Sequence, residues 1–207
     1  MKKTSLFTAF IMSVAVAFTL TSCDLISGPD LADQASVDKK LRSKIEKHID
    51  PQATIFEIDM GTTSDFSTSM NVAVVTYIEP GSTEVKRSNL DIQGKQPPRD
   101  TSNFVDRKYK NLTAEDGIKL CDIDFSQIAS NVNKSAEMIE PEGMKLDGIG
   151  MYRMKFYKDA SKIVHEFSLL SKAGTEMGTQ HGRAALITNY YETDFIADAE
   201  GNVTVKE

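Results

Sequence analysis

Two cysteines and three histidines are the side chains of this 207-residue chain best suited to nucleophilic chemistry or to binding soft metals. Cys23 directly follows an apolar stretch near the amino terminus, whereas Cys121 lies in the apolar sequence 118–123 with no adjacent base. Because a reactive cysteine needs a base or a positive charge that lowers its pKa, we expect Cys121 to be a small buried hydrophobic residue. The histidines, which lie in separate segments without metal-site spacing, are His48, His165 and His181.

Two partial matches to metal motifs lack the residues that would complete them. His165-Glu166 begins like the zinc motif HExxH, but Leu169 stands where the second histidine belongs. Asp122-x-Asp124 begins like a calcium loop, but the sharp-turn glycine and the closing glutamate are missing. An N-cap for a following helix explains the two aspartates better. The sequence therefore predicts no metal site and no cofactor.

Two further matches to enzyme motifs fail in the same way. Gly148-x-Gly150 lacks the third glycine of a dinucleotide-binding fingerprint and leads into a strand where that motif requires a helix. Ser36-x-x-Lys39 has the form SxxK, but its companion motifs are missing. We therefore predict no catalytic residues and do not expect an enzyme.

The amino terminus has the organisation of a bacterial export signal. Lys2 and Lys3 precede the apolar stretch Leu6–Leu20, which at 15 residues is shorter than the roughly 20 needed to span a bilayer. This length is typical of the hydrophobic region of a signal peptide. The stretch also lacks the amphipathic period of a helix that packs on a core.

Leu20-Thr21-Ser22-Cys23, at the end of this stretch, resembles the lipobox of bacterial lipoproteins. The resemblance implies cleavage between Ser22 and Cys23 and attachment of acyl chains such as palmitate to Cys23. Two or three chains on one residue hold a protein at a membrane essentially permanently. No later segment is apolar enough to span a bilayer, so we expect Cys23 to be the only membrane attachment. Asp24 resembles both an inner-membrane retention signal and a surface-display signal; the outer membrane or cell surface is favoured, with the inner membrane as the alternative.

The composition after residue 22 limits the partners of the protein. Removal of the signal leaves 185 residues with 22 basic and 30 acidic side chains, a net charge of −8. Nucleic acid requires a basic surface, so it is not an expected partner. An overall acidic chain also argues against a polybasic membrane patch. With Cys23 acylated and Cys121 alone, the fold has no internal disulfide.

The hydrophobic periodicity predicts two helices and several antiparallel strands. Residues 24–34 are rich in acidic residues, Gly and Pro, as in a flexible tether. Amphipathic helices are predicted at 35–48 and 124–139. Strands are predicted at 54–60, 70–78, 84–92, 144–157, 162–171, 184–197 and 203–206. These elements indicate an α+β fold with one or two units of an amphipathic helix packed on an antiparallel β-sheet.

The same pattern divides the chain into segments. We predict a signal peptide at 1–22, a tether at 23–33, helix-plus-sheet units at 34–92 and 122–207, and a linker at 93–121 that contains two consecutive prolines. The two helices are offset by 87 residues, which makes a duplication a hypothesis for the architecture. In element order the chain is similar to proteins of the PepSY and β-lactamase-inhibitor type.

Residues 172–183 are the segment with the composition of a ligand-binding loop. This stretch contains Gly178, His181 and Arg183 and is predicted as a long connection between strands; it is either a mobile ligand loop or a simple hairpin tip. The anchor and the missing catalytic residues predict a non-enzymatic binding or assembly module of the cell envelope, with an envelope protein as its partner. An envelope hydrolase with a non-local site and a small-molecule carrier with a pocket between helix and sheet are the alternatives.

Overall fold

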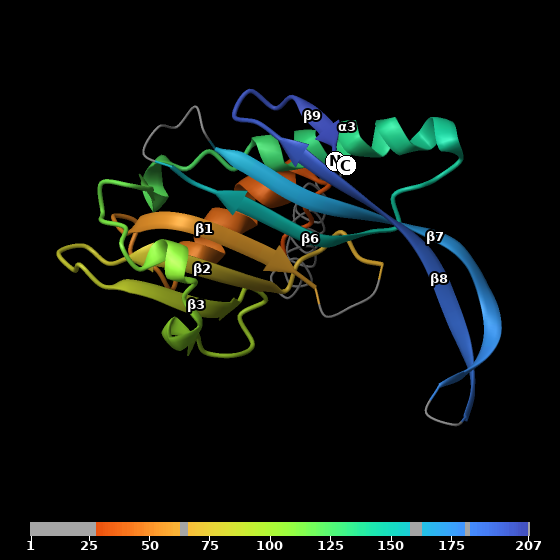
Figure 1. Cartoon of the computed structure of the whole chain (residues 1–207), viewed down its shortest axis with the longest axis horizontal. Helices are drawn as coiled ribbons and strands as arrows, with labels where there is room; N and C mark the ends of the chain where they lie inside the picture. Colours follow the sequence, from red (N-terminus) through yellow and green to blue (C-terminus); the bar gives the residue numbers. More distant parts are fainter. Residues whose placement is uncertain (1–27, 63–65, 158–162, 181–182, 207) are drawn as a thin grey trace, which may run out of the picture.

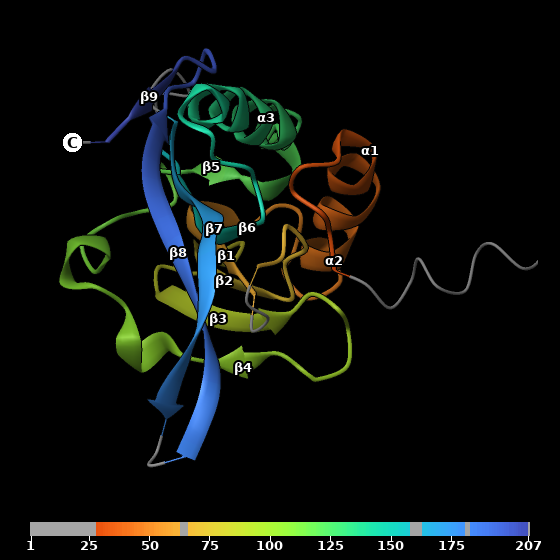
Figure 2. The same ribbon diagram turned by 90° about the vertical axis from the view of Figure 1, so that its right-hand side faces the viewer.

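The computed structural model describes residues 28–62, 66–157, 163–180 and 183–206, which form one antiparallel sheet with helices packed on one face (Figures 1 and 2). Its nine strands are β1 (Thr54–Gly61), β2 (Val72–Ile78), β3 (Val85–Asp91), β4 (Arg99–Asp100), β5 (Ile118–Lys119), β6 (Gly148–Lys155), β7 (Val164–Gln180), β8 (Arg183–Ala197) and β9 (Val203–Val205). They lie in the order β4-β3-β2-β1-β6-β7-β8-β9, and β5 pairs with the start of β1. The α+β fold expected from the sequence is confirmed.

The first helix occupies the position that the hydrophobic spacing predicts. It runs through α1 (Gln34–Ser36), a π-helical segment (Val37–Leu41) and α2 (Arg42–Glu46). Its stripe of Val37, Leu41 and Ile45 is fully buried, as expected for apolar residues on one side of a helix. The Asp33 carboxylate accepts a hydrogen bond from the Ala35 backbone N–H and so caps the amino end of the helix.

The second helix, α3 (Gln127–Ile139), lies beside the first on the same face of the sheet (Figure 2). It begins three residues later than predicted, because Asp124 forms a turn before it by accepting a hydrogen bond from the Ser126 backbone N–H. The N-cap interpretation of the aspartates was therefore wrong: the N-cap is Ser126, which makes no side-chain cap hydrogen bond, and Asp124 lies two residues before it. A 3₁₀ turn at Glu140–Glu142 and Gly143, which has a left-handed φ of 78°, end the helix.

Most of the core lies between these two helices and the sheet. One face of each central strand supplies large apolar side chains, including Ile58 and Met60 from β1 and Tyr152 and Met154 from β6, each at most 1% exposed. The helices cover them with residues such as Leu41 and Val132. The space between helix and sheet is thus filled by protein side chains.

The predicted linker at 93–121 contains structure of its own and covers part of the other face of the sheet. Two 3₁₀ helices, Ser102–Phe104 and Arg107–Tyr109, follow β4. Val105 and Tyr109 from this segment pack on Phe56 and Ile78 of β1 and β2 in a second apolar cluster. A bulge in β1 after Ile55 allows adjacent residues Phe56 and Glu57 to reach this same face.

The two halves of the chain share the sheet. β1 from the first half pairs antiparallel with β6 from the second, for example Asp59 with Arg153. On either side the order is β3-β2-β1 and β6-β7-β8, so each half contributes a helix followed by a three-stranded meander. The segment at 93–121 therefore separates the halves in sequence without dividing the sheet.

The strand β7 extends nine residues beyond its predicted end, whereas β8 begins one residue before its predicted start; together they form an arm that extends from the body (Figures 1 and 2). Residues 172–180, predicted to belong to a loop, are instead the outer part of β7 and pair with β8 as far as Gln180 opposite Arg183. A bulge between Lys172 and Gly174 interrupts the alternation of side chains between the two faces of β7. The sequence therefore lacks the period-2 pattern that would predict a strand there. The prediction of a long loop was wrong.

The described part of the predicted tether, residues 28–33, is packed against the body. The Leu31 backbone N–H donates to the Thr68 carbonyl at 3.0 Å, the Met70 N–H donates to the Pro29 carbonyl at 2.9 Å, and the Leu31 side chain is fully buried. These residues are therefore not a flexible spacer. Among the described helices, none combines the length and the apolar character needed to cross a bilayer.

Candidate functional site

The predicted anchor residues, Ser22 and Cys23, lie outside the described residues, as do the signal segment 1–22 and His181. The other two residues of the predicted ligand loop are near the tip of the arm. The Gly178 backbone pairs with Ala185 on the facing strand, and Arg183 is the first residue of β8. A Cβ on Gly178 would lie 2.2 Å from Ile187 Cδ1, so this glycine makes room for a neighbouring side chain within the arm.

The outer arm has open edges along both of its strands. β6 pairs with β7 only as far as Leu170, and β9 pairs with β8 only from Phe195 onward. Within the described chain, residues 174–180 and 183–193 therefore have only each other as strand partners. Such a stretch of seven residues extends about 23 Å, and an isolated two-stranded ribbon is at best marginally stable in water.

The arm also exposes large side chains. Met177 is 70% exposed and Tyr191 is 60% exposed. At its base the arm is held to the body through Phe66, whose ring makes an edge contact with Tyr190 at 5.7 Å and lies under the Lys172 ammonium at 5.0 Å. The outer arm is thus a two-stranded ribbon that contacts the body through Phe66 at its base and has unpaired strand edges and exposed apolar side chains.

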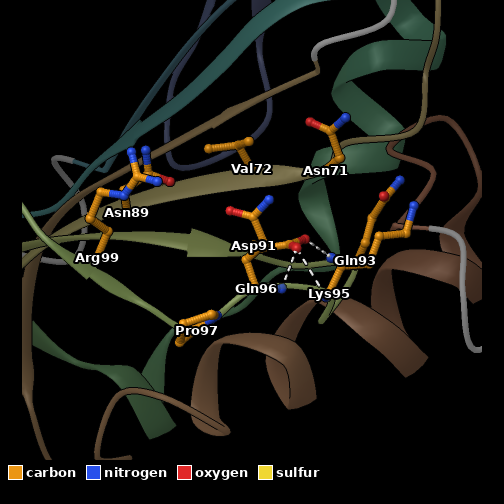
Figure 3. A pocket seen from close by; sticks show the side chains of 9 residues that line it. All are labelled: Asn71, Val72, Asn89, Asp91, Gln93, Lys95, Gln96, Pro97 and Arg99. Carbon is orange, nitrogen blue, oxygen red and sulfur yellow. Dashed lines mark hydrogen bonds between the residues drawn. The ribbon is translucent and has the colours of Figure 1, made fainter.

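A polar hollow of about 300 Å³ lies at the end of β2 and β3, beside the connection that follows β3 (Figure 3). The side chains around it are mostly amides and charged groups: Asn71, Asn89, Asp91, Gln93, Lys95, Gln96 and Arg99, with Val72 and Pro97. The Asp91 carboxylate accepts hydrogen bonds from the backbone N–H groups of residues 93, 95 and 96 at 2.8–2.9 Å. This aspartate therefore holds the loop in shape. The hollow has the size of a small-ligand site but little apolar lining.

The sheet face away from the helices carries a network of ion pairs across β1, β6 and β7. Arg153 Nε lies 2.5 Å from Asp59 Oδ1, and Lys155 Nζ lies 2.8 Å from Glu166 Oε1. Although burial alone would raise the pKa of Glu166, the hydrogen bond from Lys155 and nearby positive charges hold that pKa below its ordinary value. Each of these charges has an opposite neighbour, so the network links β1, β6 and β7 by ion pairs.

Glu57 connects this network to the segment that covers the face. Its carboxylate accepts a 2.5 Å hydrogen bond from the Tyr109 hydroxyl and lies 3.8 Å from Arg153 Nε. Burial, followed by the Glu57 interaction, raises the pKa of Tyr109 far above its ordinary value, so the phenol stays protonated and donates. This contact fastens the 3₁₀ segment to β1.

His165 and Glu166, which begin like a zinc motif in the sequence, point to opposite faces of β7. His165 is buried on the helix side, where its Nδ1 lies 2.9 Å from the Tyr152 hydroxyl. Asn131 of α3 donates to that hydroxyl at 3.3 Å, and its own Oδ1 has no hydrogen-bond partner. Burial lowers the pKa of His165 to about 4. The described residues contain no cluster of three or more potential metal ligands.

Cys121 is exposed at the surface, contrary to the prediction that it is buried. The neighbouring Leu120 and Ile123 point into the core, and the 3₁₀ turn at Leu120–Asp122 directs the thiol outward. The apolar sequence around a residue does not determine the direction of its own side chain in such a turn.

Comparison of the sequence with protein families finds no match, and comparison with curated proteins also finds none. Among solved structures, the chain is similar to a Clostridium difficile protein described as a "putative lipoprotein". The TM-score is 0.44 and the identity 13%, over 87% of this chain and 93% of that chain. At this level of likeness the similarity carries no argument about function.

Proposed function

We propose that the protein is a lipid-anchored lipoprotein of the cell envelope that acts as a non-enzymatic binding module. The support for the anchor is the lipobox-like sequence ending at Cys23, directly behind a lysine-headed apolar stretch of signal-peptide length. Acylation of Cys23 after cleavage behind Ser22 holds the mature chain at the outer membrane or the cell surface. The inner membrane is the alternative because of Asp24.

The β7–β8 arm is the binding element, and this is the observation that carries the proposal. Its outer part exposes two unpaired strand edges together with Met177 and Tyr191. An extended segment of an envelope protein can add to such an edge through main-chain hydrogen bonds, while pockets for alternate side chains give specificity. Binding also stabilises a ribbon that is marginal by itself.

A carrier of small polar ligands is the second candidate, because the hollow in Figure 3 has a suitable volume. The pocket between helix and sheet that the carrier alternative requires is occupied by core side chains. The ligand would therefore bind beside Asn89 and Arg99 at the end of β3.

Photo-crosslinking tests the role of the arm. A benzophenone amino acid at Met177 in the arm is compared with one at Phe104, which is 75% exposed in a different part of the molecule. We expect a discrete crosslinked protein from position 177 and none from position 104, and loss of that product when residues 174–193 are replaced by a short turn. Equal products from the two positions would refute the arm as the binding element.

Replacement of Cys23 tests the anchor separately. The Cys23→Ser variant should lose both signal-peptide cleavage at Ser22 and incorporation of radiolabelled palmitate, and any cleaved product should leave the membrane fraction. Normal processing with full membrane retention of this variant would contradict lipid anchoring.

A further inference from the structure

The described chain begins in a tightly packed position. Gly28 is buried, and a Cβ added to it would lie 1.5 Å from the Met70 carbonyl oxygen. The residues that follow are fixed by backbone hydrogen bonds of 2.9–3.0 Å to residues 68 and 70. The folded body therefore begins no later than Gly28.

Only five residues of chain lead from Cys23 to Gly28. Even fully extended, five residues span at most about 18 Å. A body attached to a membrane through Cys23 is thus held next to the headgroups, and the surface around Gly28 must face them. This consequence rests on the lipid anchor of the proposed function.

The surface around Gly28 belongs to the first helix. A hollow of about 280 Å³ beside Gly28 is lined by Ser36, Lys39 and Lys40 from that helix and by Ser69. Lys39, Ser43 and Lys47 form an exposed stripe along the helix at every fourth residue. The arm leaves the body on another side, away from α1 and α2 (Figure 1).

The charge of this helix is opposite to that of the whole molecule. Residues 34–47 carry five basic side chains, Lys39, Lys40, Arg42, Lys44 and Lys47, against two acidic ones, a net of +3, whereas the chain after residue 22 has a net charge of −8. The nearby Asp30 and Asp33 each accept a hydrogen bond from a backbone N–H of their own turn. The Arg42 guanidinium is held by the carbonyl oxygens of Leu120 and Ile123, and Lys39 and Lys47 are the basic residues of this helix that are exposed.

We propose that the lysine face of the first helix, centred on Lys39 and Lys47, rests on anionic lipid headgroups beside the anchored cysteine. Each lysine near an anionic surface contributes about a fivefold gain in binding at low ionic strength. Because the remainder of the mature chain is acidic, the same membrane repels its other surfaces. The contact fixes the orientation of the body and presents the arm to the side.

Lysine footprinting on vesicles tests this orientation. The mature chain with Cys121→Ser, which keeps Cys23 as its one thiol, is coupled to a maleimide lipid in vesicles of phosphatidylcholine alone or with about one third phosphatidylglycerol. Acetylation of Lys39 and Lys47 is compared with acetylation of Lys110 and Lys145, which are also exposed. We expect Lys39 and Lys47 to become several-fold less reactive on the anionic vesicles, and 0.5 M salt to reverse the effect.

A matched pair of charge-reversal variants completes the test. The half-buried Lys40 and Lys44 of the same helix should also become less reactive on the anionic vesicles. Lys39→Glu with Lys47→Glu should abolish this protection of Lys40 and Lys44, whereas Lys110→Glu with Lys145→Glu should leave it unchanged. Protection that is equal at all lysines, or equal effects of the two double variants, would overturn the proposal. Because the lipid is supplied chemically, this failure is distinct from a failure of acylation in cells, which the Cys23→Ser experiment reports.

Discussion

Mild acid should destabilise the protein through the buried imidazole of His165. This side chain is 1% exposed, and its Nδ1 lies 2.9 Å from the Tyr152 hydroxyl, which can donate its proton to the neutral ring. A protonated ring would have to donate from Nδ1 to a hydroxyl that already accepts from Asn131. Burial is the main cause of the lowered pKa, and the carboxylates of Asp124 and Asp198 oppose it only in part.

The size of the effect follows from the two pKa values of His165. In the unfolded chain the pKa is near its ordinary value of 6.5, and in the folded protein it is lowered to about 4. Between these values the unfolded state binds more protons, so the free energy of unfolding rises with pH in this window and falls as the pH is lowered through it. Linkage gives a loss of about 2 kcal/mol between pH 7 and pH 5, approaching about 3 kcal/mol below pH 4.

Urea unfolding followed by far-ultraviolet circular dichroism at pH 7, 6 and 5 measures this loss. The chain without residues 1–22 and with Cys23→Ser is compared with the same chain carrying His165→Asn, whose amide oxygen can still accept from Tyr152 but does not titrate. We expect the difference between pH 7 and pH 5 to shrink by about 2 kcal/mol in the variant. The carboxyl groups interfere little, because the pKa values of Asp124, Asp198 and Glu166 are held below their ordinary range.

His48→Asn is the matched control. His48 is half-buried at the end of the first helix, and burial lowers its pKa as well, so it contributes a loss of the same sign from a more solvated site. This variant should keep most of the wild-type pH dependence. If His165→Asn and wild type lose the same stability between pH 7 and pH 5, the neutral buried imidazole is not the source, and the reasoning is refuted.

Three further substitutions test the packing by denaturant unfolding. Glu57→Gln should cost about 1–3 kcal/mol, because it removes the charge from a buried hydrogen bond to Tyr109; an unchanged free energy of unfolding would show that this contact does not hold the 3₁₀ segment. Gly148→Ala should cost about 2 kcal/mol or more, because the added Cβ would lie 2.7 Å from backbone atoms. Gly61→Ala should be nearly neutral, because a Cβ there would have no atom within 4 Å. Asn131→Leu should cost less than about 1 kcal/mol or stabilise, because removal of a buried oxygen without a partner offsets the lost 3.3 Å hydrogen bond to Tyr152; a loss above about 2 kcal/mol would contradict this reasoning.

The periodic elements could be predicted from the sequence because their signal is local. Val37, Leu41 and Ile45 repeat with the period of one helical face, and each is fully buried. The strands up to β3 were placed within two residues of their observed ends, since alternating or continuous β-branched runs are bounded there by Gly, Pro and Asp. Fold class follows from such patterns without knowledge of the strand order.

The outer part of β7 could not be predicted because its determinants are not in its hydrophobic pattern. The bulge between Lys172 and Gly174 shifts this strand by a residue, and polar residues and glycine dominate residues 174–180 beyond it. Both signals resemble those of a loop. The facing strand was predicted at 184–197, where the tyrosine pair at 190–191 lies in a β-rich run, but the sequence did not indicate its partner.

The basic charge of the first helix was also missed, and for a different reason. A net charge of −8 averages over the mature chain and conceals a stretch of net +3 at residues 34–47. Its importance depends on the packing of Gly28 against Met70, a contact between segments about forty residues apart that no local pattern encodes. Likewise, the direction of Cys121 depends on a 3₁₀ turn that the sequence did not reveal.

The two halves of the chain contribute similar parts to the sheet, and the way in which they differ favours the second half, which carries the arm, as the proposed binding element. The first strand of each meander, β1 or β6, lies at the centre of the sheet, and the second and third strands follow outward on either side. Both helices lie on one face, as a duplicated helix-plus-meander unit would give (Figure 2). The additions to each half differ: residues 99–112 cover the helix-free face of the first, whereas the second keeps that face open and extends two strands into the arm. Since the shared elements suffice to enclose the core, a ribbon that buries little apolar surface adds little to folding. An extension that contributes so little to stability is better explained by contact with another molecule, which is the role proposed for the arm.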